Sequence, residues 1–303
     1  MAKKILITGG TGFIGQVLCR ELLAGNHELT VFSRQKAESV KACCGRVEAV
    51  RDLQQLWSHP GFDAVINLAG EGIADKRWSE ARKQQLRDSR IATTESLVNV
   101  IRSWGRAPEV LVSGSAVGFY GDQGPDIVTE DTRPHDEFTH RLCRDWENAA
   151  LALSEDGVRV CVSRTGVVAG PGGGFLERMV LPFKLGLGGR IGSGTQYMPW
   201  VHRDDVVSAL IWMMETSDAS GPFNVASPNP VTNAEFTRCL GKVLHRPTLF
   251  PVPAPLLKAG LGEMSRLLLG GQQAIPAKLS SAGFQFRYSD LEQALADCLK
   301  HQQ

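Results

Sequence analysis

Three glycines near the start of the chain recur at intervals of three residues, in the run Gly9-Gly10-Thr11-Gly12-Phe13-Ile14-Gly15. Gly9 would allow a tight exit from the apolar run before it, and Gly12 would let a diphosphate approach the N–H groups at a helix N-terminus. Gly15 would permit close packing of that helix on a sheet, and the helix dipole would favour the anion. We therefore predict that a dinucleotide binds here, to Gly9, Thr11, Gly12, Phe13, Ile14 and Gly15; the alternative is a turn without a ligand.

The residues after the next apolar run indicate which dinucleotide binds. An Asp or Glu there would accept hydrogen bonds from a ribose 2′-hydroxyl and repel a 2′-phosphate. This chain has Ser33 and Arg34 instead, and a guanidinium offers a fork of donors that matches phosphate oxygens. We therefore predict NADP(H) rather than NAD(H), with a merely solvated arginine as the alternative.

Two clusters of charged residues could support other chemistry. His202, Asp204 and Asp205 are metal-ligand types, but their spacing contains no i, i+4 helical pair, so we expect a structural polar network and no metal. Arg87 and Arg90, three residues apart, could meet a substrate phosphate from one helix face. The alternative is a solvated face for the whole basic stretch, which comprises Lys76, Arg77, Arg82, Lys83, Arg87 and Arg90. Its cations lack interleaved stacking aromatics, which argues against nucleic acid.

The elements that would position these residues alternate between apolar strands and amphipathic helices. We expect strands at residues 3–8, 27–33, 62–68, 109–113 and 158–164, and later helices at 79–104, 137–154 and 206–215. The first helix would follow the glycine turn and end at Gly25-Asn26. This order predicts an α/β fold, a doubly wound parallel Rossmann sheet.

The composition of the chain changes after the alternating elements. Residues 170–194 are rich in glycine, residues 247–255 hold four prolines, and helical patterns return at 256–269 and 289–299. We expect a Rossmann domain over residues 1–225, with 170–200 contributing to the substrate side. Residues 226–303 would form a smaller C-terminal α+β lobe.

The overall composition is that of an ordinary globular protein. Of the 303 residues, 43% are hydrophobic and 21% are charged, and the net charge of +1 gives no reason to expect nucleic acid or an acidic membrane as a partner. Seven scattered cysteines without metal spacing favour a reducing compartment. No signal-peptide pattern or long apolar run appears, so we expect a cytoplasmic protein. Whether the helices pair two copies into a homodimer stays open.

Four further motifs occur in order along the chain, namely Asp63 to Gly70, Ser113 to Gly121, Arg164 to Gly172 and Trp200 to Val206. Together with the glycine turn they resemble the extended short-chain dehydrogenase/reductase family of nucleotide-sugar epimerases and dehydratases. The whole pattern is most similar to its YfcH-type epimerase family proteins. The resemblance implies that Leu68, Ala69, Gly70 and Glu71 lie beside the cofactor and that Ser115 holds a substrate oxygen; a serine bonded to backbone is the alternative.

The chain departs from this family at the proton donor. Family members carry a tyrosine four residues before a lysine on the helix after the serine strand, and residues 137–147 contain neither. Alignment on Glu147 puts Thr139 and Cys143 in the two places, and a slip of one residue gives His140 and Arg144. His140 could shuttle a proton, or it could be an ordinary hydrogen-bonded histidine. Tyr120 could be the acid instead, or only an aromatic residue in a turn.

The family resemblance implies an NADP(H)-dependent enzyme of the epimerase, dehydratase or reductase type, that is, an oxidoreductase. Hydride would pass between the nicotinamide and a carbinol or carbonyl carbon of a nucleotide-sugar-like or other small substrate, with Ser115 orienting the oxygen. The alternative is a non-catalytic NADP(H)-binding redox sensor or docking protein, which loss of the tyrosine and lysine favours.

Overall fold

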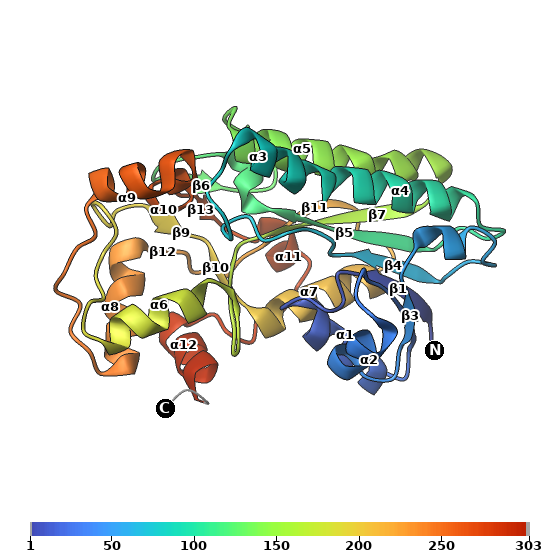
Figure 1. Ribbon diagram of the computed structural model, residues 1–303, viewed down its shortest axis with the longest axis horizontal. Helices are drawn as coiled ribbons and strands as arrows, with labels where there is room; N and C mark the ends of the chain where they lie inside the picture. Colours follow the sequence, from blue (N-terminus) through green and yellow to red (C-terminus); the bar gives the residue numbers. More distant parts are fainter. Residues whose placement is uncertain (1, 301–303) are drawn as a thin grey trace.

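A seven-stranded sheet forms the centre of the structure, a computed structural model that describes residues 2–300 (Figure 1). Its strands pair only in parallel, in the order β3-β2-β1-β4-β5-β7-β11. The strands are β1 (Lys4–Thr8), β2 (Glu28–Phe32), β3 (Glu48–Val50), β4 (Ala64–Asn67), β5 (Val110–Ala116), β7 (Arg159–Thr165) and β11 (Gly221–Val225). The order reverses between β1 and β4, and ligands of doubly wound sheets bind outside the carboxyl ends of the strands at such a point.

Helices cover both faces of this sheet (Figure 1). One face carries α1 (Gly15–Ala24), α2 (Ala37–Cys44) and α7 (Arg203–Glu215), and the other carries α3 (Glu80–Asp88), α4 (Ile91–Arg102) and α5 (Phe138–Leu151). Ile5 and Ile7 of β1 are buried in a core with α1 and α7, while Leu6 between them is buried in a core with α4. Strands that are apolar on both faces are typical of a parallel sheet covered by helices. The doubly wound fold is confirmed.

Several elements differ from their predicted bounds. The helix expected over residues 79–104 is two helices, α3 and α4, which are interrupted at Ser89 and Arg90. The helix expected over 137–154 ends at Leu151 and continues as a 3-10 helix, Ala152–Asp156. Inside the glycine-rich stretch lies an unexpected helix, α6 (Gly174–Lys184). Glycine content conceals its apolar periodicity, which buries Leu176, Val180 and Phe183.

A smaller lobe lies beside the sheet (Figure 1). Its helices are α6, α8 (Asn233–Leu244), α9 (Ala254–Leu261), α10 (Arg266–Leu269) and α12 (Leu291–Leu299). Short strands pair there, β8 (Val167–Ala169) with β10 (Trp200–His202) and β9 (Tyr197–Met198) with β12 (Val231–Thr232). A further pair is β6 (Ile127–Val128) with β13 (Gln273–Ala274), followed by α11 (Ala277–Ser281). The lobe has a hydrophobic core of its own, which includes Trp200, Phe236 and Leu295.

None of the helices within residues 2–300 combines the length and the apolar character that a membrane span requires.

Candidate functional site

The glycine turn forms an open cradle at the end of β1. Gly9 has a φ of 70°, and a Cβ there would lie 2.4 Å from the carbonyl oxygen of Leu68, so only glycine fits. A Cβ on the exposed Gly12 would have a single near neighbour, the Gly9 oxygen at 3.2 Å. The backbone N–H groups of Phe13 and Ile14 donate to no other group within residues 2–300. Free N–H groups before a helix are suited to bind an anion such as a diphosphate.

The other two glycines of the turn allow close packing, but against different partners than we predicted. A Cβ on Gly15 would lie 2.3 Å from the oxygen of Gly9, so this glycine lets α1 pass close to the turn itself. The glycine that allows close contact with the sheet is Gly10. A Cβ on Gly10 would lie 2.8 Å from Cγ1 of Val31 in β2.

A pocket of about 300 Å³ opens over this turn. The glycine turn, the loop after β4, strand β8 and the start of α6 all contribute to its wall. The lining residues are Gly9, Gly12, Phe13, Ile14, Gly15, Leu68, Gly70, Val167, Val168, Gly174 and Phe175. The structure thus brings most of the predicted cofactor residues together, whereas Thr11, Ser33, Arg34, Ala69 and Glu71 lie outside the lining. Sequence reasoning missed Phe175, because nothing marked a helix there.

Phe13 ties the turn to the loop that precedes α6. A Cβ on Gly173 would lie 2.7 Å from the Phe13 ring, and the guanidinium of Arg203 lies over the ring, 4.7 Å from its centroid. Arg203 also donates from Nη1 to the carbonyl oxygen of Pro171, at 2.7 Å. The two segments that wall the pocket therefore hold each other in place.

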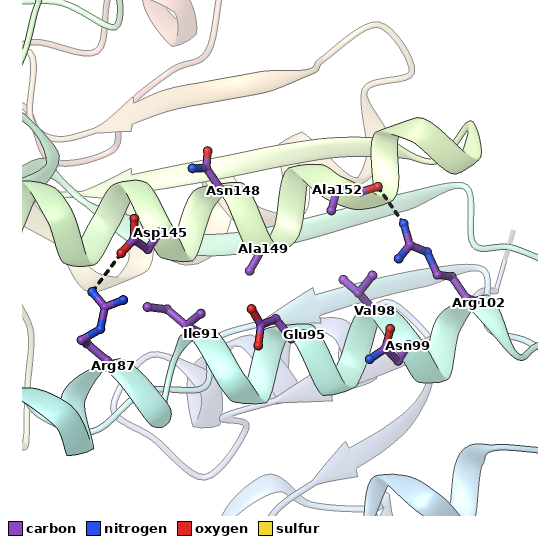
Figure 2. A pocket seen from close by; sticks show the side chains of 10 residues that line it. All are labelled: Arg87, Ile91, Glu95, Val98, Asn99, Arg102, Asp145, Asn148, Ala149 and Ala152. Atoms are coloured by element: carbon purple, nitrogen blue, oxygen red, sulfur yellow. Dashed lines mark hydrogen bonds and ion pairs between the residues drawn. The ribbon is translucent and has the colours of Figure 1, made fainter.

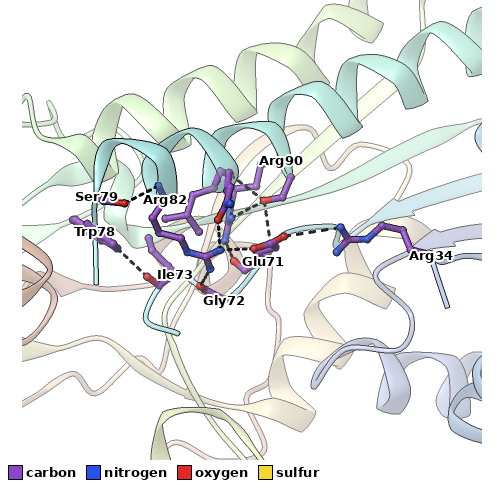
Figure 3. Close-up of polar contacts among 11 residues, drawn as sticks. Arg34, Glu71, Gly72, Ile73, Trp78, Ser79, Arg82 and Arg90 are labelled. Carbon is purple, nitrogen blue, oxygen red and sulfur yellow. Dashed lines mark hydrogen bonds and ion pairs between the residues drawn. The ribbon is translucent and has the colours of Figure 1, made fainter. Parts of the chain in front are cut away.

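Arg34 follows the end of β2 and reaches toward Glu71 (Figure 3). Its side chain is 84% exposed, and Nη1 lies 3.9 Å from Oε1 of Glu71. Arg82 binds the same carboxylate, and this hydrogen bond lowers the pKa of Glu71. Ser33 is buried, and its Oγ accepts a 3.2 Å hydrogen bond from the backbone N–H of Gln35. Arg34 is therefore held by a single distant, already paired carboxylate and can turn toward a phosphate.

Ser115 lies near the carboxyl end of β5 and binds a side chain rather than backbone. Its Oγ donates to Oε1 of Glu147 at 2.6 Å, and Arg164 binds both oxygens of this carboxylate at 2.9 Å. Ser115, Glu147 and Arg164 are all buried. The serine that the family resemblance implies is thus fixed in orientation by a buried ion pair.

The other two candidate acids have different surroundings. Tyr120 is fully buried, its hydroxyl donates to Asn224 Oδ1 at 2.6 Å and accepts from Arg164, and burial raises its pKa to about 12. We therefore assign it a structural role. His140 is half-buried, and its Nδ1 lies 2.7 Å from the carbonyl oxygen of Phe119. A carbonyl oxygen only accepts, so Nδ1 carries a proton, and in the neutral ring Nε2 then has a lone pair.

Thr139 and Cys143 are the residues of α5 that face the end of β5. A Cβ on Gly118 would lie 3.2 Å from Cβ of Thr139 and 3.9 Å from Sγ of Cys143. This face is shared with Glu147, whereas Arg144 is exposed and pairs with Asp145 at 2.8 Å. Burial raises the pKa of the Cys143 thiol to about 12. Neither residue supplies a positive charge at the place of the family's lysine.

The cluster around His202 connects the last helix to α7. Asp205 accepts from the backbone N–H groups of Arg287 and Tyr288, at 2.7 and 3.0 Å. Nδ1 of His202 accepts from the N–H of Asp204, so in the neutral ring Nε2 carries the proton, which faces Asp297 Oδ2 at 3.5 Å. Nδ1 is thus engaged, whereas Nε2 is buried without a hydrogen-bond partner within residues 2–300, and His202, Asp204 and Asp297 lie close enough to hold an ion. Asp204 and Asp205 thus take part in polar contacts of the kind we predicted, and the expectation that no metal binds here stays a prediction.

Arg87 and Arg90 do not share a helix face, contrary to one of our sequence interpretations. Arg87 lies on an open groove of about 590 Å³ between the outer sides of α4 and α5, where Nη1 pairs with Asp145 at 2.9 Å (Figure 2). Arg90 lies past the end of α3 and turns inward, toward the loop after β4 (Figure 3). The break between α3 and α4 separates the two cations.

Comparisons with known proteins agree with this geometry. The sequence model of the NAD dependent epimerase/dehydratase family matches residues 5–226, and a model described as a domain of unknown function (DUF1731) matches residues 252–298. Epimerase family protein Mb2239 of Mycobacterium bovis is 42% identical over 293 residues, 96% of each chain. Epimerase family protein YfhF of Bacillus subtilis is 38% identical over 300 residues, 97% of each chain.

Solved structures extend the comparison. Human epimerase family protein SDR39U1 (isoform 2), solved with NADPH, superposes with a TM-score of 0.90 at 35% identity, over 98% of this chain and 99% of that one. UDP-glucose 4-epimerase of Thermotoga maritima, solved with UDP-glucose, has a TM-score of 0.77 at 19% identity, over 98% of both chains. The second likeness shows the fold alone.

Proposed function

Because the chain belongs to the NAD-dependent epimerase/dehydratase family, we propose that it is an NADP(H)-dependent oxidoreductase or epimerase. Its substrate is a nucleotide-sugar-like or other small molecule that carries a carbinol or carbonyl carbon. The cofactor, when bound, accepts or donates the hydride at that carbon. The open cradle of the glycine turn is the observation that carries this proposal, since Gly12 leaves room for a diphosphate and two N–H groups await an acceptor.

The choice of NADP(H) rests on Arg34. The end of β2 carries no acid that would bind a ribose 2′-hydroxyl, and Arg34 is exposed and loosely held. A guanidinium there matches a 2′-phosphate. The human relative SDR39U1, solved with NADPH, supports the same choice.

The side chains at the carboxyl ends of the strands have distinct roles in this proposal. The hydroxyl of Ser115 donates its hydrogen bond to Glu147, so its oxygen still has a lone pair that can accept a hydrogen bond from a substrate hydroxyl. Glu147 and Arg164 position the serine without touching the substrate. His140 keeps a lone pair on Nε2 and is the group we assign to take up or return the proton.

Calorimetric titration of cofactor-stripped protein with NADPH and with NADH tests the proposal. We expect tight binding of NADPH and weak binding of NADH, and we expect Arg34→Glu to reverse this preference. If neither cofactor binds the wild type, the turn is only architecture and the proposal is wrong. If Arg34→Glu leaves both affinities unchanged, the NADP(H) assignment is wrong while the family's cofactor chemistry stands.

One observation favours a second candidate function, a non-catalytic NADP(H)-binding sensor. Residues 137–147 contain no tyrosine and no lysine, and alignment on Glu147 puts Thr139 and Cys143 in their places. A sensor must bind NADP⁺ and NADPH with different affinities, because a ligand with equal affinity for two states shifts neither. A mass-spectrometric screen of cofactor-loaded protein against nucleotide sugars and carbonyl compounds separates the two functions. Conversion of any of them excludes the sensor, and failure of all of them together with unequal affinities favours it.

A further inference from the structure

Arg90 is a cation beside the candidate cofactor site, where it lies against Gly70 of the pocket lining. It lies in the break between α3 and α4, where α3 ends and the backbone turns before Ile91 begins α4. The guanidinium points inward, against the loop that follows β4 (Figure 3).

The guanidinium of Arg90 is held in place from two sides. Nη2 donates to the carbonyl oxygen of Glu71 at 2.8 Å, and Nη1 donates to the carbonyl oxygen of Leu86 at 3.2 Å. The planar group also stacks on Trp146 of α5, 5.3 Å from the ring. Trp146 is itself oriented by a 3.1 Å hydrogen bond from its indole N–H to Thr94.

This fixed cation borders the pocket over the glycine turn. A Cβ on Gly70, one of the residues that line the pocket, would lie 3.1 Å from Cζ of Arg90. On its other side Arg90 lies near Cys143, and its charge lowers the pKa of that thiol against the larger effect of burial. Alignment on Glu147 puts Cys143 at the place of the family's lysine, and on that alignment Arg90 brings a positive charge to a region where α5 has no lysine.

The charge of Arg90 is not neutralised by the protein. Its bonded partners are two carbonyl oxygens and the hydroxyl of Ser89, and it forms no ion pair with a carboxylate in residues 2–300. Burial lowers the pKa of Arg90, but a guanidinium stays protonated at neutral pH. The carboxylate of Glu71 and the guanidinium of Arg82 act on Arg90 without bonding to it and oppose each other, so a partly buried cation without an ion-pair partner within residues 2–300 remains to attract further oxygen acceptors.

We propose that Arg90 binds the nicotinamide riboside half of the cofactor, in place of the lysine that α5 lacks. This inference rests on the proposed NADP(H) binding. The expected acceptors are the hydroxyls of the nicotinamide ribose or the carboxamide oxygen. Arg90 keeps its proton throughout, so it fixes the cofactor in position and leaves proton transfer to another group.

The test compares a whole cofactor with a fragment of it. Adenosine 2′,5′-bisphosphate carries the adenine and the 2′-phosphate but no nicotinamide riboside. Calorimetry with Arg90→Met should show NADPH bound roughly tenfold more weakly or worse, as for the loss of a charge-assisted hydrogen bond, with the fragment bound as in the wild type. Arg90→Lys restores the charge without the fork and should recover part of the NADPH affinity.

The matched control is Arg87→Met, which removes a cation of the same stretch on the outer groove and should change neither affinity. Equal weakening of NADPH and the fragment by Arg90→Met would mean that Arg90 supports only the shape of the pocket, and no weakening would mean that it does not reach the cofactor. Either result overturns the inference. If the wild type binds neither molecule, the proposed function is wrong and this inference fails with it.

Discussion

Oγ of Ser115 lies 2.6 Å from Oε1 of Glu147, and this bond joins β5 to α5 across the candidate site. Arg164 of β7 completes the group, because its Nε and Nη2 each lie 2.9 Å from an oxygen of the same carboxylate. Glu147 is 4% exposed and Arg164 is 5% exposed. The orientation of the Ser115 hydroxyl therefore depends on the buried ion pair between Glu147 and Arg164.

Glu147→Gln should destabilise the protein strongly. The amide keeps the shape of the side chain but leaves the charge of Arg164 buried without an anion, which typically costs about 3–5 kcal/mol. Urea unfolding measures the change in the free energy of unfolding. The control is Asp145→Asn, which removes a more exposed partner of Arg87 and should cost no more than about 1 kcal/mol. Equal losses for the two variants would contradict the role given to the buried pair.

Substitutions at two glycines of the turn should separate folding from binding. Gly12→Ala places a methyl group near only the Gly9 oxygen, at 3.2 Å, so we expect a melting temperature close to that of the wild type. The methyl group lies where the diphosphate must approach, so NADPH binding should weaken at least tenfold in calorimetry. Gly15→Ala, with a Cβ 2.3 Å from the same oxygen, should instead lower the melting temperature. Full NADPH affinity in Gly12→Ala would show that the cofactor does not use this cradle.

Cysteine alkylation tests whether Cys143 has become a nucleophile. The thiolate is the reactive form, and burial raises the pKa of Cys143 to about 12, so this thiol stays protonated at pH 8. Peptide mapping after brief iodoacetamide treatment of the native protein should find Cys43, which is exposed, modified first. Modification of Cys143 as fast as Cys43 would show that Cys143 is a reactive thiol and would contradict its description as a buried, protonated side chain.

Sequence reasoning predicted the elements that local patterns specify. The glycine turn, the strands of the central sheet and the absence of an acid after β2 each depend on a few neighbouring residues, and the structure brings the turn and the β4 loop into one pocket. The alignment on Glu147 puts Thr139 and Cys143 in the two places of the family's tyrosine and lysine, and this assignment stays a prediction. These predictions rest on spacing along a single strand or helix, which the sequence shows directly.

What could not be predicted depends on contacts between distant segments. The hydrophobic periodicity of the sequence does not show that the helix breaks at Arg90. It also does not show that the Arg90 guanidinium lies over the ring of Trp146, 56 residues later in the chain. The bond from Ser115 to Glu147 crosses from a strand to a helix, and the burial of Tyr120 depends on Asn224 of β11. Helix α6 was missed because its glycine-rich surroundings resemble a loop.

The stability of the protein should fall in mildly acid solution, and His202 should account for part of the loss. Burial, which outweighs the nearby Asp204 and Asp297, lowers the pKa of His202 in the folded protein. Below the ordinary histidine pKa of about 6.5, the unfolded chain binds a proton that the folded protein does not, so the free energy of unfolding decreases.

Between pH 7.5 and 5.5 the wild type should lose about 1 kcal/mol more of its free energy of unfolding than His202→Gln, measured by urea unfolding at each pH. The pKa of His59 is also lowered by burial, but His59 is present in both proteins and cancels in the comparison. Parallel pH profiles would mean that His202 already carries its proton in the folded state, paired with Asp297.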